Sequence, residues 1–204
     1  MTKHLNSTFN KPYNKHNIDA YHAAITKTAG KKIIFDSGCG NGRSTRILAE
    51  NFPDAFVIGI DKSTSRIDKG NTRFSNGSNS CRDNFCIVRA DITDFWRLAV
   101  DAHISLYKHF IFYPNPWPKS QHFKRRWHGS PLFKTLLQLS GQLELRSNWP
   151  LYVTEFQQAL ALADIPSQLN LLSLKGNNDI TDFETKYRRS GHSLWQLNAE
   201  LKGV

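Results

Sequence analysis

The stretch KKIIFDSGCGNG, residues 31–42, decides the fold of this chain. Its short apolar run, residues 31–36, ends at glycines and therefore predicts a buried strand. The glycines at positions 38, 40 and 42 predict a sharp turn in which the backbone can pass close to a ligand. The loop lacks both the dinucleotide fingerprint G-x-G-x-x-G and the G-K-[ST] of a phosphate-binding loop. It predicts a ligand site that is not built for pyrophosphate, or, alternatively, a tight strand-to-helix turn without a ligand.

Strands and helices alternate along the rest of the chain. We expect strands at residues 31–36, 56–61, 86–89, 109–113, 142–147, 169–174 and 192–201, and helices at residues 18–29, 43–52, 62–69, 94–100, 132–139 and 149–163. This alternation predicts an α/β fold with a doubly wound, mostly parallel sheet of seven strands and helices on both faces. Ligands of such sheets lie beyond the carboxyl ends of the strands, so we expect the chemistry there.

The charge of the chain is strongly positive and unevenly distributed. Its 27 Lys and Arg residues exceed its 17 Asp and Glu residues by ten. Residues 1–35 hold six lysines and one aspartate, residues 102–143 hold six basic and no acidic residues, and the other two parts of the chain are nearly balanced. An excess of this kind favours a polyanionic partner, although a basic surface that serves only solubility is the alternative. Within the acid-free part, basic residues alternate with aromatic ones, which suits phosphate contact and base stacking.

Composition excludes several classes of protein. The chain has 204 residues, and it contains no apolar run near the ~20 residues of a membrane helix. Its polar first residues lack the apolar segment of a signal peptide, so we expect a cytoplasmic protein. Three cysteines, two of them only five residues apart, predict neither a disulfide framework nor a metal site. We expect a basic arm over residues 1–16 and a single domain over residues 17–204, in a monomer or homodimer.

Acidic residues follow the first three expected strands: Asp36, Asp61 and Asp91. A carboxylate that opens a glycine loop suits a cationic ligand, and one after the second strand can accept two ribose hydroxyls. A carboxylate after the third strand can accept an adenine amino group. This set favours S-adenosyl-L-methionine over a nicotinamide cofactor. The candidate cofactor-binding residues are Asp36, Gly38, Gly40, Gly42, Asp61, Asp91 and Asn115, the last of which follows the fourth expected strand.

Four blocks of the chain resemble a known family. Residues 36–61, DSGCGNGRSTRILAENFPDAFVIGID, resemble the cofactor half of class I methyltransferases. YPNPWPK at 113–119 and HFKRR at 122–126 closely resemble the signature F-P-D-P-W-x-K-x-x-H-x-K-R-R of bacterial tRNA (guanine-N7)-methyltransferases. SNWPLY at 147–152 and TDFE at 181–184 are similar to two further blocks of that family, T-D-x-x-x-Y and T-x-[FY]-E. The resemblance runs from about residue 31 to about residue 200.

The resemblance implies a function. It implies S-adenosyl-L-methionine as the cofactor, tRNA as the partner, and 7-methylguanosine in the variable loop of tRNA as the product. Lys119, Thr181 and Glu184 would contact the RNA or its target guanosine, and Arg125 and Arg126 the RNA backbone. For His122, contact with a phosphate or base and simple packing are equal alternatives. The candidate substrate-binding residues are Lys119, His122, Arg125, Arg126, Asn148, Thr181 and Glu184, and the candidate catalytic residue is Asn115.

Two substrate-side positions depart from the family. Asn115 stands where the family has an Asp regarded as catalytic, and Asn148 stands where the family has an Asp that contacts guanosine. Guanine N7 carries no proton, so methyl transfer needs no general base, and alignment alone can supply about 7–11 kcal/mol. An amide stabilises the positive charge on a methylated guanine less well than a carboxylate. We therefore expect retained cofactor binding with weakened or redirected base recognition. The alternatives are an inactive relative that binds cofactor and RNA, and a methyltransferase for another nucleic acid or base.

Overall fold

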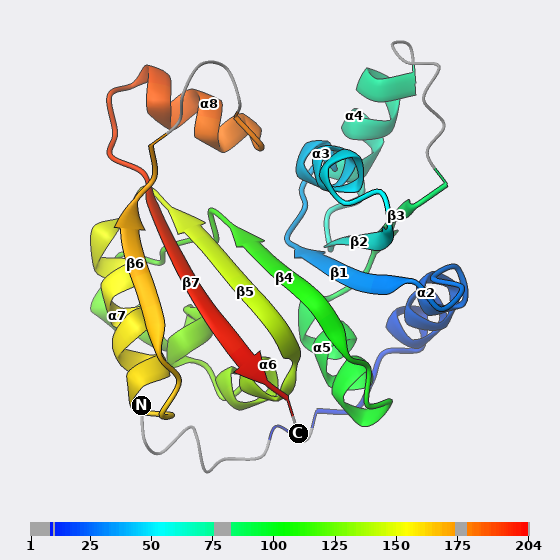
Figure 1. The fold of residues 1–204 in the computed structure, drawn as a ribbon, viewed down its shortest axis with the longest axis horizontal. Helices are drawn as coiled ribbons and strands as arrows, with labels where there is room; N and C mark the ends of the chain where they lie inside the picture. The colour runs from blue at the N-terminus through cyan, green and yellow to red at the C-terminus, as the bar shows by residue number, and fades with distance from the viewer. Residues whose placement is uncertain (1–8, 10, 76–82, 174–178, 204) are drawn as a thin grey trace.

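The computed structural model describes residues 9, 11–75, 83–173 and 179–203. These residues form one seven-stranded sheet with the strand order β3-β2-β1-β4-β5-β7-β6 (Figure 1). The strands are β1 (Lys32–Ser37), β2 (Ala55–Asp61), β3 (Phe85–Arg89), β4 (Leu106–Phe112), β5 (Ser140–Ser147), β6 (Ser167–Leu171) and β7 (Trp195–Lys202). The first five strands pair in parallel, and β7 runs antiparallel between β5 and β6. The predicted fold class is confirmed.

Helices cover both faces of this sheet. They are α2 (Lys15–Thr26), α3 (Arg43–Asn51), α4 (Thr64–Ser75), α5 (Ile92–Asp101), α6 (Phe133–Gln138), α7 (Pro150–Ala161) and α8 (Asp182–Arg189), with 3₁₀ turns η1 (Ser120–Arg125) and η2 (Trp127–Gly129). Side chains alternate along each strand, so Ile34 packs into a smaller core with α3, while Phe35 packs into the larger core with α2, α5, α6 and α7. None of the helices within the described residues is long and apolar enough to span a membrane.

Three local predictions need correction. The first helix begins at Lys15 with Asn14 as its N-cap, because the Asn14 side chain accepts from His16 N at 2.9 Å. Asn17 lies inside the helix, where it is buried and its amide donates to Asp94 at 2.6 Å. Helix α4 continues to Ser75, beyond the predicted end at residue 69. Helix α8 was not expected at all. The predictions for residues 1–8, 10, 76–80 and 174, and for the cysteine at 81, lie outside the described residues.

The topology gathers the candidate chemistry at one edge of the sheet. β1, β2 and β4 are parallel neighbours, so their carboxyl ends lie side by side. Helix α8 lies beyond this edge, across from α3 and α4 (Figure 1). Residues 36–61 and residues 181–184, which are far apart in the sequence, therefore lie at the same edge of the sheet.

Candidate functional site

The glycine loop turns directly after β1. Two backbone hydrogen bonds attach the loop to the end of β2: the N–H groups of Gly38 and Cys39 donate to the carbonyl of Ile60 at 2.8 and 3.1 Å. All three loop glycines have positive φ, at 85°, 60° and 74°. A Cβ at Gly40 would meet no protein atom within 4 Å, whereas one at Gly42 would lie 2.1 Å from Ile87 Cδ1. The loop thus borders open space at its centre and is packed tightly at its end.

A cavity of about 230 Å³ adjoins this loop. It is lined by Gly38, Cys39, Gly40, Asn41, Arg43, Ser44, Arg66, Lys69, Phe112, Thr181, Asp182 and Phe183. Three parts of the chain that the sequence singled out therefore share one wall: the glycine loop, the end of β4 and the TDFE block. The first two come from the sheet edge and the third from α8.

Asp36 lies behind the loop as a buried carboxyl group. Its Oδ2 accepts hydrogen bonds from Ser44 Oγ at 2.6 Å and Thr45 Oγ1 at 2.7 Å, at the start of α3. Burial raises the pKa of Asp36 to about 6, because removal from water penalises the charged form more than the two hydroxyl donors favour it. A cationic ligand group near this carboxyl group would stabilise its charged form and lower its pKa.

Asp61 is also buried, and both of its oxygens have partners. Oδ2 accepts from the N–H of Gly40 at 3.0 Å, and Oδ1 accepts from the N–H of Ser63 at 2.8 Å. The half-exposed Arg66 forms an ion pair with Oδ1 at 2.9 Å. A ribose that bound to Asp61 would therefore have to replace Arg66.

None of the three predicted acids lines the cavity of the glycine loop. Asp36 and Asp61 are buried next to the loop, whereas Asp91 lies at a different place. It caps α5 by accepting from Thr93 N at 2.9 Å, and it lines a separate cavity of about 300 Å³ together with His16 and Lys62. The structure therefore places Asp36 and Asp61 at the glycine loop and Asp91 at a different cavity.

The turn after β4 is strained and carries Asn115 outward. Tyr113 and Trp117 both have positive φ, at 50° and 45°, a conformation that costs about 1–3 kcal/mol for such residues. The exposed Asn115 accepts a hydrogen bond from Trp117 N at 3.2 Å. Arg125 stacks over the Trp117 ring at 4.7 Å, and His122 packs against that ring edge-on. Three predicted residues are thus grouped around one tryptophan, with Lys119 exposed just before η1.

Arg126 differs from its neighbour Arg125. Only 4% of Arg126 is exposed, and its guanidinium pairs with Glu155 and donates to the carbonyl of Trp117 at 3.0 Å. These contacts hold the strained turn against α7. The prediction that this residue contacts the RNA backbone does not fit its burial, because its donors face protein acceptors.

Thr181 and Glu184 form the N-terminus of α8. Thr181 Oγ1 accepts from Glu184 N at 3.0 Å, and Glu184 is fully buried. The carboxylate of Glu184 accepts from Tyr113 Oη at 3.0 Å and from Arg146 Nη1 at 2.8 Å. Its charge is therefore compensated inside the protein, and the predicted contact with RNA does not fit this placement. Asn148 lies apart from this cluster, where its amide is 3.3 Å from His192 Nδ1.

Comparison with known proteins identifies the family. The model of the Methyltransf_4 family, described as "Putative methyltransferase", matches residues 30–197. The chain belongs to this methyltransferase family. A protein of Leifsonia xyli subsp. xyli named tRNA (guanine-N(7)-)-methyltransferase is 24% identical over 182 residues, which cover 86% of this chain and 78% of that protein. One of the same name from Pseudoalteromonas atlantica is 26% identical and covers 82% and 72% of the two chains. The resemblance found in the sequence is confirmed.

Solved structures of methyltransferases share the fold. The 16S rRNA methyltransferase KamB superimposes with a TM-score of 0.60 at 11% identity, over 94% of this chain and 95% of that one. The 16S rRNA (adenine(1408)-N(1))-methyltransferase of Catenulisporales acidiphilia, solved with its cosubstrate SAM, superimposes with a TM-score of 0.59 at 16% identity, over 94% and 93%. At these identities the likeness shows the methyltransferase fold.

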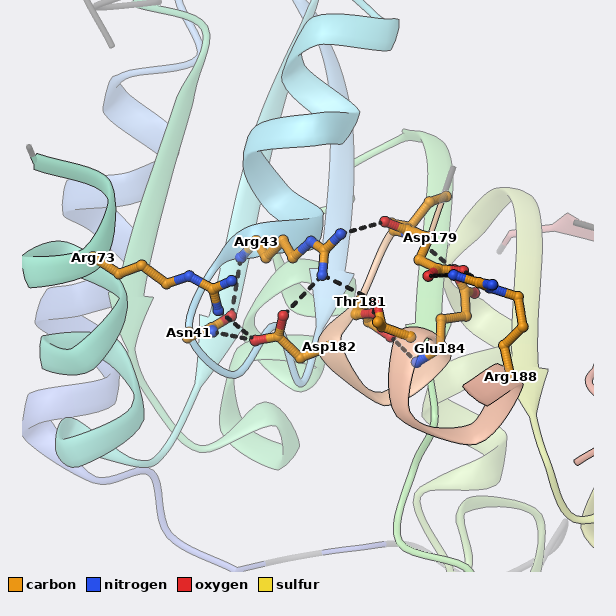
Figure 2. A network of polar contacts seen from close by, with 10 residues as sticks. Asn41, Arg43, Arg73, Asp179, Thr181, Asp182, Glu184 and Arg188 are labelled. Carbon is orange, nitrogen blue, oxygen red and sulfur yellow. Dashed lines mark hydrogen bonds and ion pairs between the residues drawn. The ribbon is translucent and has the colours of Figure 1, made fainter. Parts of the chain in front are cut away.

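In this methyltransferase, Asp182 is a site residue that the sequence did not reveal. It accepts from Asn41 Nδ2 at 2.7 Å, Arg43 Nη1 at 2.8 Å and Arg73 Nη1 at 3.0 Å (Figure 2). One carboxylate thereby ties α8 to the glycine loop, to α3 and to α4. Its partners lie 109–141 residues away along the chain, so no local pattern could have indicated these contacts. Over the described residues, no cluster of three or more His, Cys, Asp or Glu side chains is arranged to hold a metal ion.

Proposed function

We propose that this chain transfers the methyl group of S-adenosyl-L-methionine to guanine N7 of a tRNA. The observation that carries the proposal is the cavity shared by the glycine loop and the TDFE block. In the relatives' family these blocks are the cofactor half and the substrate half of the enzyme, as the resemblance implies. The family match and the names of the relatives support the same reaction.

The residues around the loop fit the cofactor chemically. When bound, S-adenosyl-L-methionine supplies an electrophilic methyl group on a positively charged sulfur. Asp36 would balance its ammonium group, and the open space at Gly40 would admit the ligand beside the backbone. The cavity of about 230 Å³ is smaller than the roughly 300 Å³ at which ligand pockets begin. Binding therefore requires Arg66 to swing away from Asp61, which frees that carboxylate for the ribose.

Asn115 would orient the target base. It stands at the end of β4 on a strained turn, and strain of this kind occurs at sites where geometry is fixed for function. Because N7 carries no proton, the amide needs to position the base and does not need to remove a proton. A carboxylate there would also stabilise the charge that develops on the ring. We therefore expect slow transfer by the wild type and faster transfer by Asn115→Asp.

A cofactor- and RNA-binding relative without turnover is the second candidate. Two substrate-side carboxylates of the family are amides in this chain, at Asn115 and Asn148. The third, Glu184, is paired with Arg146 and accepts from Tyr113. All three positions thus lack the free negative charge that would stabilise a methylated guanine.

Methyl transfer from radiolabelled S-adenosyl-L-methionine to unmodified tRNA tests both candidates. The wild type, Asn115→Asp and Asp36→Asn would be compared, the last as a variant with impaired cofactor binding. Label incorporated by the wild type supports the enzyme, and label incorporated only by Asn115→Asp supports the inactive relative. Absence of label with every variant, together with no cofactor binding by the wild type, would refute the proposal.

A further inference from the structure

A groove of about 700 Å³ lies between α8 and the helices α3 and α4. It is lined by Arg43, Arg73, Asp179, Asp182, Thr185, Lys186, Arg188, Arg189 and Ser190. Five cationic side chains thus face two carboxylates. Three of the five cations, Lys186, Arg188 and Arg189, are close together in the sequence of α8, and the fold brings Arg43 and Arg73 to the same groove.

The groove adjoins the cavity of about 230 Å³ beside the glycine loop, which is the proposed cofactor cavity. Arg43 and Asp182 line both, and they form the wall between them. On α4 the cations Arg66, Lys69 and Arg73 are spaced three and four residues apart, so they share one face of the helix. The first two line the cavity and the third lines the groove. A basic stripe therefore leads from the cavity into the groove.

The two carboxylates hold the arginines in place. Asp182 binds Arg43 and Arg73, and Asp179 accepts from Arg188 at 2.8 and 2.6 Å (Figure 2). The hydrogen bond from Arg188 lowers the pKa of Asp179. Partial burial acts to raise the pKa of Asp182, but the hydrogen bonds from Arg43 and Asn41 hold this pKa below its usual value. Both acids stay ionised. They fix the direction of the guanidinium groups and leave a net charge of about +3 in the groove.

We propose that this groove binds the phosphate backbone of the RNA whose target base enters the cofactor cavity. This inference rests on the proposed function and locates the RNA contact on α4 and α8, away from the Lys-Arg-Arg block. The exposed Lys186 and Arg189 can donate to phosphate oxygens, whereas donors of Arg43 and Arg188 already bind the two carboxylates. An aromatic pair on α8 also favours RNA over an acidic protein, because Phe183 is 48% exposed and stacks on Tyr187 with 6.0 Å between ring centroids. Exposed rings beside a basic groove are suited to stacking on bases.

Equilibrium binding of unmodified tRNA at several salt concentrations tests the proposal. The groove variant is Lys186→Ala/Arg189→Ala, since both side chains are exposed and neither forms an ion pair among the described residues. The control is Lys27→Ala/Lys31→Ala, which removes the same charge from exposed residues near the amino end of β1, at the opposite edge of the sheet.

We expect the groove variant to bind tRNA more weakly and to flatten the plot of log K against log salt by about two units, the effect of two lost phosphate contacts. The control should keep the wild-type slope, and all three proteins should bind S-adenosyl-L-methionine equally. An unchanged slope in the groove variant, with tRNA bound by the wild type, would overturn this inference alone and leave the groove as a structural ion network or a face for an acidic protein. Failure of the wild type to bind tRNA would instead refute the proposed function.

Discussion

Asp36 combines burial with a role at the cofactor loop, and this makes its protonation measurable. With a pKa of about 6, the free protein takes up a proton at this carboxyl as the pH falls through 6. A cationic cofactor binds the ionised form, so its affinity should decrease from pH 7 to pH 5 and binding should release protons near pH 6. Calorimetry of S-adenosyl-L-methionine binding in buffers of different ionisation enthalpy measures both effects. Asp36→Asn should abolish the proton release, and equal release by the two proteins would exclude Asp36 as its source.

Arg125 and Arg126 are adjacent in sequence and should respond differently to alanine. Removing Arg126 leaves Glu155 with only His128 as a partner and leaves the carbonyl of Trp117 without its donor. Arg126→Ala should therefore lower the free energy of unfolding by about 3 kcal/mol. Arg125→Ala removes an exposed side chain and should leave stability within about 0.5 kcal/mol. Denaturant unfolding of both variants checks the difference. Similar losses from the two would show that the turn does not depend on the Arg126 contacts.

The sequence could not distinguish these two arginines. Both stand in a block that resembles the family signature, and both are cationic neighbours of aromatic residues. Which one turns inward depends on Glu155, which lies 29 residues later on α7. In the same way, burial of Glu184 depends on Arg146 of β5 and on Tyr113 in the turn after β4. Motifs predicted which segments form the site, whereas side-chain direction depends on tertiary contacts.

At the scale of elements, α8 is the main difference between prediction and structure. It has only eight residues and is strongly polar, so it lacks the apolar periodicity that predicts a helix. One local signal was nevertheless present, because Thr181 and Glu184 have the spacing of a capping box. The strands and helices that line the cores were predictable because their apolar runs have the period of buried strands and amphipathic helices.

The attachment of α8 to the glycine loop should depend on Asp182. Asp182→Ala removes an acceptor shared by Asn41, Arg43 and Arg73. We expect faster amide exchange over α8 and the glycine loop, with little change in the sheet. Asp19→Ala, which removes an exposed i,i+4 partner of Lys15, is the matched control. Unaltered exchange in α8 of the Asp182 variant would mean that its other contacts suffice.

At the scale of the whole molecule, buried titratable groups set the pH dependence of stability. Burial lowers the pKa of His109 to about 3 and of His128 to about 4, so between pH 6 and 4.5 the unfolded chain binds two protons that the native protein does not. Asp36, with its pKa raised to about 6, binds one proton in the native protein only. The net difference of one proton predicts that the free energy of unfolding decreases by about 1.4 kcal/mol per pH unit as the pH falls through this window.

Urea unfolding at pH 6, 5.5, 5 and 4.5 measures this slope. A variant Asp36→Asn should show a steeper decrease, of about two protons, because the opposing group is absent. A stability of Asp36→Asn that is constant across this range would show that the two histidines titrate normally in the native protein.

If the cofactor loop and the substrate block act on one tRNA base, the position of the transferred methyl group shows it most directly. Unmodified tRNA would be incubated with wild-type protein and labelled S-adenosyl-L-methionine, and the label would then be located by chemical cleavage at 7-methylguanosine and by nucleoside analysis. We predict label at N7 of a guanosine, in low yield with the wild type and in higher yield with Asn115→Asp. Label on another atom or another base would contradict it.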